Sequence, residues 1–188
     1  HATHNARMRR YIRAPQLGGA SYFFTLTLAE RRGSDLLIRH VDALRQAFTK
    51  VRARHPFMIE AIVILPDHLH ALWRMPEDDG DYTLRWRLIK AHFSRQMPEG
   101  ERVSRSRAVK RERGIWQRRY WEHQVRDEND WARHVDYIHY NPVKHGLVAR
   151  PSDWPHSSLH RFVREGRLPA DWGAGMKLTR HDSDGFGE

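Results

Sequence analysis

Residues 62–73 read IVILPDHLHALW, and this stretch decides the fold. Two runs rich in β-branched and large apolar residues flank a two-residue connection, which predicts a tight β-hairpin. Successive side chains of a strand point to opposite faces of its sheet, so His68 and His70 share one face. The apolar residues around them line the opposite, buried face. Two imidazoles on one face can bind a metal ion or a phosphate, although alternating polar residues also mark any half-exposed strand.

The segments on either side of the hairpin complete a β-α-β-β-α-β order. Aromatic and β-branched residues over 22–28 predict a first strand, and an apolar stripe from Leu37 to Val51 predicts an amphipathic helix. After the hairpin, a second helix is expected over 83–97 and a last strand over 117–126. This order predicts an α+β fold of the ferredoxin-like, split βαβ type, with an antiparallel sheet whose first and third strands are central.

An added helix near the C-terminus, expected over 130–140, carries a second group of polar residues. It leads into residues 135–148, VDYIHYNPVKHGLV, in which Tyr137 and Asn141 are four apart and therefore lie on the same helix face. Pro142 disfavours helical geometry at the residue before it, so the helix is expected to end there. A half-buried core tyrosine is the ordinary interpretation of Tyr137. A role in chemistry requires the histidine pair to lie beside it.

The length of the chain indicates a single domain, and its charge indicates that it binds a polyanion. The 188 residues are assigned to one domain with a basic arm at 1–20, a basic loop at 99–115 and a loose tail at 167–188. A formal net charge of +10 attracts phosphate, although a solvated basic surface has the same composition. The chain has no cysteine, which excludes disulfides and cysteine-based zinc sites. No apolar run reaches membrane-spanning length, so no membrane partner is expected.

Arginines interleaved with aromatic residues suggest contacts with single-stranded nucleic acid. In WQRRYW, residues 116–121, guanidinium groups could bind phosphates and rings could stack on bases, while some of the rings are expected in the core. The residues expected to bind DNA are Arg9, Arg10, Arg13, Lys90, Arg118, Arg119 and Lys144.

Four strings carry a family resemblance: LPDHLHALW, WQRRYWEHQVRDENDW, HVDYIHYNPVKHGLV and SDWPHSSLHRFV. They resemble the REP-associated tyrosine transposases, which belong to the single-tyrosine HUH transposase and nuclease superfamily. The resemblance covers residues from about 22 to 166. It implies that Tyr137 is the catalytic nucleophile and that His68, His70 and Asn141 bind Mg²⁺ or Mn²⁺.

The resemblance further implies a metal-dependent single-stranded DNA endonuclease and strand transferase. Such an enzyme cleaves and rejoins DNA at a hairpin of a repetitive extragenic palindrome, through a covalent 5′-phosphotyrosine and without a nucleotide cofactor. A bacterial, cytoplasmic and nucleoid-associated protein is expected, as a monomer with a dimer left open. One alternative is a domesticated protein that binds hairpin DNA without cleaving it. Another is a phosphoesterase that activates water with the histidines. Such enzymes carry a second H-x-Ser/Thr motif in a matching strand, and the nearest candidate strings here, residues 55–57 and 123–125, lack it.

Overall fold

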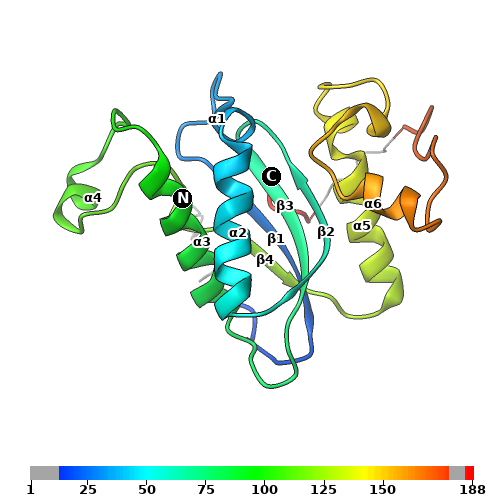
Figure 1. Cartoon of the computed structure of the whole chain (residues 1–188), viewed down its shortest axis with the longest axis horizontal. Helices are drawn as coiled ribbons and strands as arrows, with labels where there is room; N and C mark the ends of the chain where they lie inside the picture. Colours follow the sequence, from blue (N-terminus) through cyan, green and yellow to red (C-terminus); the bar gives the residue numbers. More distant parts are fainter. Residues whose placement is uncertain (1–12, 178–184) are drawn as a thin grey trace, which may run out of the picture.

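Residues 13–177 and 185–188 are described by the computed structural model, and they form a four-stranded antiparallel sheet packed against helices (Figure 1). The strands are β1 (Ser21–Thr27), β2 (Met58–Ile64), β3 (His68–Arg74) and β4 (Trp121–Gln124), in the spatial order β2-β3-β1-β4. The first and third strands are therefore central. This arrangement confirms the predicted α+β, ferredoxin-like fold.

The hairpin between β2 and β3 closes as predicted, and β3 then pairs on its other side with β1. The backbone N–H of Leu65 donates to the carbonyl of His68 over 2.9 Å, across the connection at Pro66 and Asp67. In the antiparallel pairing of β1 with β3, Thr25 lies opposite His70 and Thr27 lies opposite His68. Directly opposed residues project from the same face of a sheet. The two threonines therefore flank the two histidines.

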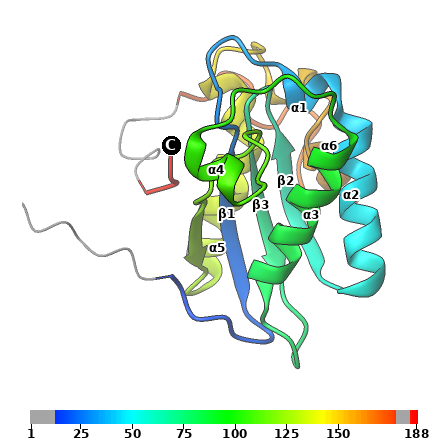
Figure 2. The same cartoon turned by 90° about the vertical axis from the view of Figure 1, so that its left-hand side faces the viewer.

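One face of the sheet is covered by α2 (Val41–Arg54) and α3 (Tyr82–Gln96) (Figure 2). Asp81 caps α3 by accepting the backbone N–H of Leu84 over 2.8 Å. At the centre of this layer Trp73 of β3 stacks on Trp86 of α3, with ring centroids 4.0 Å apart. Such a pair contributes about 1 kcal/mol beyond the burial of its area.

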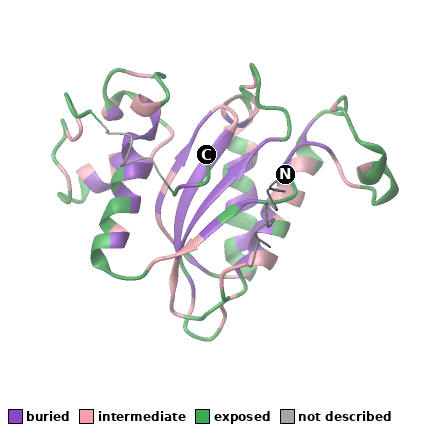
Figure 3. Cartoon of the chain, turned by 180° about the vertical axis from the view of Figure 1, so that it is seen from behind, coloured by how far each residue is buried: buried purple, intermediate pink, exposed green. Residues whose placement is uncertain are grey.

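The other face is partly covered by α5 (Glu128–Lys144), with η1 (Pro151–Asp153) and α6 (Leu159–Arg164) beyond it. A smaller core joins them, in which Phe23 of β1 and Leu72 of β3 pack against Ile138 of α5 and Phe162 of α6. Buried residues line the side of α5 that faces the sheet (Figure 3). None of the helices in the described part of the chain is long and apolar enough to span a membrane.

Several boundaries differ from the prediction. The first predicted helix is split into α1 (Leu36–Arg39) and α2, and the last strand is shorter than residues 117–126 because the chain before it forms only an isolated bridge from Trp116 to Leu28. The basic stretch at 99–115 contains a short helix, α4 (Arg105–Val109). The guanidinium groups of Arg107 and Arg113 donate to backbone carbonyls around it, which gives this stretch internal contacts that a solvated loop would lack.

The helix α5 does not end at Asn141, and the expectation based on Pro142 is wrong. Pro142 lies inside the last turn, and the helix runs on to Lys144. The turn closes because Gly146, with φ of 67°, donates to Val143 over 2.9 Å, and the next N–H donates to the carbonyl of Pro142 over 2.9 Å. This is a Schellman motif, which needs glycine at the left-handed position. Burial of the helix against the sheet outweighs the local preference of the residue before proline.

Arg85 is expected to be a main contributor to stability outside the sheet. Its side chain is fully buried and donates to three backbone carbonyls and to the carboxylate of Asp79, which lies 2.9 Å away. Arg85→Met should lower the free energy of unfolding by about 2–4 kcal/mol, because the buried carbonyls lose their partners. Urea denaturation measures this change. The matched variant Arg87→Met, at an exposed position of the same helix, should change it by less than about 0.5 kcal/mol, and equal effects would contradict the assignment.

Candidate active site

The two histidines of β3 are oriented by acceptors on their inner nitrogens. His68 Nδ1 lies 2.6 Å from a carboxylate oxygen of Asp67, and His70 Nδ1 lies 2.8 Å from the hydroxyl of Thr25. That hydroxyl donates its own hydrogen to the carbonyl of Phe186 over 2.6 Å, so it accepts from His70. Both rings therefore carry hydrogen on Nδ1, and in a neutral imidazole this leaves a lone pair on Nε2. Partners of this kind orient metal-binding histidines in many proteins.

Burial keeps His70 uncharged. Removal from water lowers the pKa of His70 to about 4, although a contact with Glu188 works in the opposite direction. The ring is therefore neutral near pH 7. A neutral imidazole with a free Nε2 lone pair is the form that binds a metal ion.

Three residues of α5 lie beside the histidine pair. Tyr137 is buried, and its ring centroid is 5.2 Å from that of His70. Asn141 is fully buried one helical turn later. Lys144 donates from Nζ to the Tyr137 hydroxyl over 2.9 Å. The residues predicted from two distant segments, Tyr137 with His68, His70 and Asn141, are thus brought together in one site.

The end of the chain enters this site. One carboxylate oxygen of Glu188, Oε1, lies 3.3 Å from His68 Nε2, 2.7 Å from His70 Nε2 and 3.3 Å from Asn141 Nδ2. Its other oxygen pairs with Lys144. Phe186 stacks on Tyr137 with centroids 3.7 Å apart and planes 5° from parallel. The expectation of a loose tail at 167–188 is therefore wrong for its last residues, which are held by stacking and by charge.

Burial also affects the pKa of Tyr137 and the pKa of the Glu188 carboxyl group. Removal from water raises the pKa of Tyr137, and the charge of Glu188 raises it further. Burial would raise the pKa of Glu188 too, but its contacts with His145, His68 and His70 lower it well below the ordinary value, so the group is ionised. An anionic oxygen therefore faces the imidazole nitrogens and the nucleophile candidate.

The donor set fits a divalent metal ion. Nε2 of His68 and Nε2 of His70 face the same carboxylate oxygen, an arrangement that is favourable only when a proton lies between nitrogen and oxygen or when a cation takes the place of that proton. The side-chain oxygen of Asn141 is buried without a hydrogen-bond partner, and an amide can be turned so that oxygen and nitrogen exchange places. Imidazole nitrogen with amide and carboxylate oxygen suits Mn²⁺ and, less well, Mg²⁺.

Sequence reasoning missed four contributors to this site. Asp67 directly precedes the first histidine, and Thr25 becomes visible only when the register of β1 against β3 is known. His145 follows Asn141 by four residues, the same spacing that selected Asn141 after Tyr137. Glu188 has no local signal, because it reaches the site from a separate segment.

The residues expected to bind DNA fall into separate groups. Arg9 and Arg10 lie outside the described residues. Lys144 is at the Tyr137 hydroxyl, and Arg119 lines a hollow of about 250 Å³ together with Thr25 and Gly187, next to the site. Lys90 and Arg118 line a basic groove of about 480 Å³ between α3 and the α4 stretch. Arg13 lies over the ring of Tyr120.

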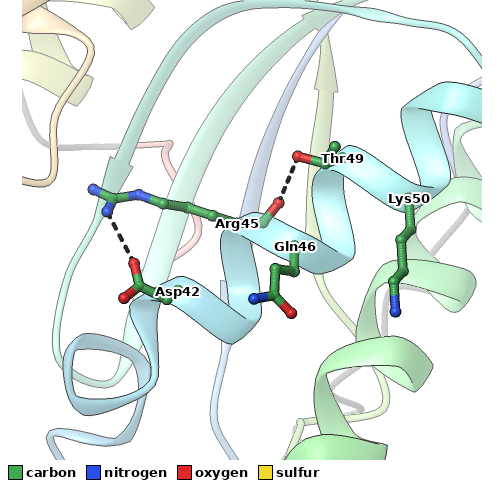
Figure 4. A pocket seen from close by; sticks show the side chains of 5 residues that line it. All are labelled: Asp42, Arg45, Gln46, Thr49 and Lys50. Atoms are coloured by element: carbon green, nitrogen blue, oxygen red, sulfur yellow. Dashed lines mark hydrogen bonds and ion pairs between the residues drawn. The ribbon is translucent and has the colours of Figure 1, made fainter.

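Two further features lie apart from the histidine pair. His123 and His134 flank the carboxylate of Asp130, at 2.7 Å and 3.3 Å, and this carboxylate also accepts the backbone N–H of Arg126. The group ties the start of α5 to β4. An open hollow on α2 (Figure 4) belongs to the opposite layer of the sheet, and its Arg45 already pairs with Asp42. Its lining residues are Asp42, Arg45, Gln46, Thr49 and Lys50.

An antiparallel ferredoxin-like sheet with paired histidines beside a helical tyrosine has the arrangement of a single-tyrosine transposase. No family model matches the sequence. The chain is 46% identical over 161 residues to a provisionally named REP-associated tyrosine transposase of Haemophilus influenzae, covering 85% of this chain and 91% of the relative. It is 43% identical over 164 residues to a REP-associated tyrosine transposase of Escherichia coli, covering 87% and 88%.

A solved structure, described as a REP-associated tyrosine transposase bound to a REP hairpin, matches with a TM-score of 0.74 and 40% identity, covering 90% of this chain and 99% of that one. These similarities show the family. The chain belongs to the REP-associated tyrosine transposases and is accordingly a DNA-processing enzyme.

The buried histidines predict a loss of stability in acid. Burial lowers the pKa of His139 to about 3 and that of His70 to about 4, whereas both have a pKa of about 6.5 when the chain is unfolded. As the pH falls below about 6.5, the unfolded chain binds protons that the folded chain does not, so the free energy of unfolding should decrease down to about pH 3, the pKa of folded His139. Urea denaturation with chelator at several pH values measures this. His139→Gln should show a shallower decrease, and identical slopes would contradict it.

Proposed function

We propose that this transposase cleaves and rejoins single-stranded DNA beside a hairpin, with Tyr137 as the nucleophile and a divalent ion held by His68, His70 and Asn141. The REP hairpin named in the matched structure is the expected substrate class. Chromosomal DNA as the substrate is consistent with the expected cytoplasmic, nucleoid-associated location.

One observation carries the proposal. The Tyr137 hydroxyl is held by Lys144, and an anionic oxygen of Glu188 is held by His68, His70 and Asn141 in the same site. The Lys144 ammonium contacts both the hydroxyl and this carboxylate. Transfer of a phosphodiester to a tyrosine requires a nucleophile and a binding position for an anionic phosphate oxygen. Here Tyr137 is the nucleophile, Glu188 Oε1 marks the oxygen position, and Lys144 contacts both residues.

The reaction balances without another reactant. The Tyr137 oxygen forms a bond to phosphorus, the bond from phosphorus to the 3′ oxygen breaks, and the phenol proton is in net transferred to the departing 3′ oxygen. The product is a 5′-phosphotyrosine, and attack by another 3′ hydroxyl reverses the step. When bound, a divalent ion supplies Lewis acidity for a non-bridging oxygen. Lys144 orients the tyrosine, and its charge favours the phenolate that develops during attack.

The carboxylate of Glu188 must leave before a phosphate can take its place. Its Oε1 atom lies within 3.3 Å of His68, His70 and Asn141, which leaves no room there for a second anionic oxygen. Phe186 occupies the face of Tyr137 at the same time. The proposal therefore includes displacement of residues 186–188 by the substrate.

Basic residues line two surfaces to which the DNA can bind. The hollow lined by Arg119, next to Thr25, leads to the histidine pair and suits the single strand. The groove lined by Lys90 and Arg118, with further arginines of α3 and the α4 stretch, suits the phosphates of a duplex stem. Arg118 already pairs with Glu112 over 2.8 Å, so its contribution is expected to be smaller than that of Arg119.

A water-activating phosphoesterase fits the geometry less well. On β1 and β2 the residues opposite the histidines are Thr27, Thr25 and Val63, so neither neighbouring strand supplies a second histidine motif facing the first. The only hydroxyl oxygen held by a cation at the site, among the described residues, is that of Tyr137.

Trapping of the covalent adduct tests the nucleophile. Tyr137→Phe should bind a labelled REP hairpin carrying a single-stranded flank but form no adduct that survives denaturing electrophoresis, because the attacking oxygen is gone. Tyr140→Phe is the matched control: its hydroxyl bonds to the carbonyl of Met176, away from the histidines, so most adduct should remain. Wild-type protein that binds the hairpin without any adduct would instead support the non-cleaving alternative. An adduct that survives Tyr137→Phe and disappears in Tyr140→Phe would overturn the assignment.

Salt dependence tests the basic surface. Binding of the hairpin should weaken steeply with salt concentration because phosphate contacts release counterions, and Arg119→Ala should reduce the logarithmic slope by about one unit. Fluorescence anisotropy over a salt series measures both. Arg164→Ala, at an exposed position of α6 on the opposite edge of the sheet, should leave the slope unchanged. Binding that is insensitive to salt would contradict the role given to the charge.

A further inference from the structure

We infer that His145 is a third imidazole ligand of the metal centre. This residue is not part of the paired-histidine motif, and it reaches the site from the end of α5. The inference rests on the proposed metal centre formed by His68, His70 and Asn141, and it adds a donor to that centre.

The position of His145 relative to the common oxygen carries the inference. His145 Nε2 lies 3.1 Å from Glu188 Oε1, the same atom that lies 3.3 Å from His68 Nε2 and 2.7 Å from His70 Nε2. The rings of His68 and His145 have centroids 4.9 Å apart and planes at 74°. Three imidazole nitrogens, two from β3 and one from the end of α5, thus contact one oxygen atom.

These separations match those between neighbouring ligands around a single ion. In an octahedron with metal–ligand distances of about 2.1 Å, adjacent donor atoms lie about 3 Å apart. The distances from Oε1 to the three nitrogens, 2.7–3.3 Å, scatter around this value. The ligand atoms of His68, His145 and Glu188 all lie close enough to one another to hold one ion, whereas His70, which contacts the same carboxylate oxygen, lies outside that group and would have to move slightly to join it. The carboxylate oxygen then occupies a ligand position that a substrate phosphate oxygen can take over.

The fold holds His145 in this place through the end of the helix. His145 donates its backbone N–H to the carbonyl of Asn141 over 3.0 Å, and Gly146 then leaves the helix with a positive φ. The side chain of His145 retains 30% of its exposure, whereas those of His68 and His70 are almost completely buried. His145 is thus the ligand on the solvent side of the centre, where ion and substrate enter.

Binding of Mn²⁺ to the full chain tests the inference without requiring cleavage. Electron paramagnetic resonance reports free and bound Mn²⁺, and its pulsed form counts coordinated imidazole nitrogens. Wild-type protein should show three such nitrogens. His145→Ala should show two and bind Mn²⁺ at least about tenfold more weakly, because even residues that only support ligands cost this much. His92→Ala, a histidine on α3 away from the site, should match wild type.

The outcomes separate this inference from the proposed function. Two coordinated nitrogens in wild type, unchanged in His145→Ala but reduced in His68→Ala, would overturn the role of His145 and leave the proposed centre intact. Binding unaffected by either His68→Ala or His145→Ala would overturn both. Because His145 is partly exposed, its variant should unfold at the same temperature as wild type, and circular dichroism checks that a loss of binding is not a loss of fold.

Discussion

The pairing of Thr25 with His70 across the two central strands is the constraint on which the site depends. One hydroxyl accepts from the histidine and donates to the carbonyl of Phe186, so a single atom links β1, β3 and the end of the chain. A shift of β1 by one residue would turn the hydroxyl to the other face and place an apolar side chain, Phe24 or Leu26, opposite His70. Positions in the middle of a sheet move least, which suits groups that must hold an ion at fixed distances.

The two faces of the sheet have different roles: one is an apolar core and the other contains the polar site. The face under α2 and α3 is filled with aromatic and aliphatic side chains around Trp73 and Trp86, and it supplies most of the apolar burial. The face under α5 has a smaller core and contains the polar site. Buried polar groups add little net stability and are costly when unpaired. The apolar layer therefore allows the other face to carry histidines, an amide and a carboxylate.

The sequence predicted the fold class and the strand order, since hairpins and helix faces follow from local patterns of side chains. The proximity of Tyr137 to His68 and His70 was implied by the family resemblance and not by those patterns. It did not predict that α5 continues through Pro142, because tertiary burial outweighed a local preference. Glu188 and Thr25 were also missed. Contacts between segments far apart in the chain depend on register and on the path of loops, which local periodicity does not encode. The residues proposed for DNA binding were chosen by charge alone, and the structure separates them into groups that charge could not distinguish.

The contacts of Phe186 and Glu188 also define the two chemical groups that a small inhibitor of this site would need. A flat ring lies parallel to Tyr137, and one glycine further along the backbone a carboxylate reaches the imidazoles and Lys144. The guanidinium of Arg133 lies 5.0 Å from the centre of the Phe186 ring. A compound that keeps an aromatic ring and an acid at this spacing would have both of its anchoring points specified by the protein itself, which makes the segment 186–188 a starting template for chemical probes of the enzyme.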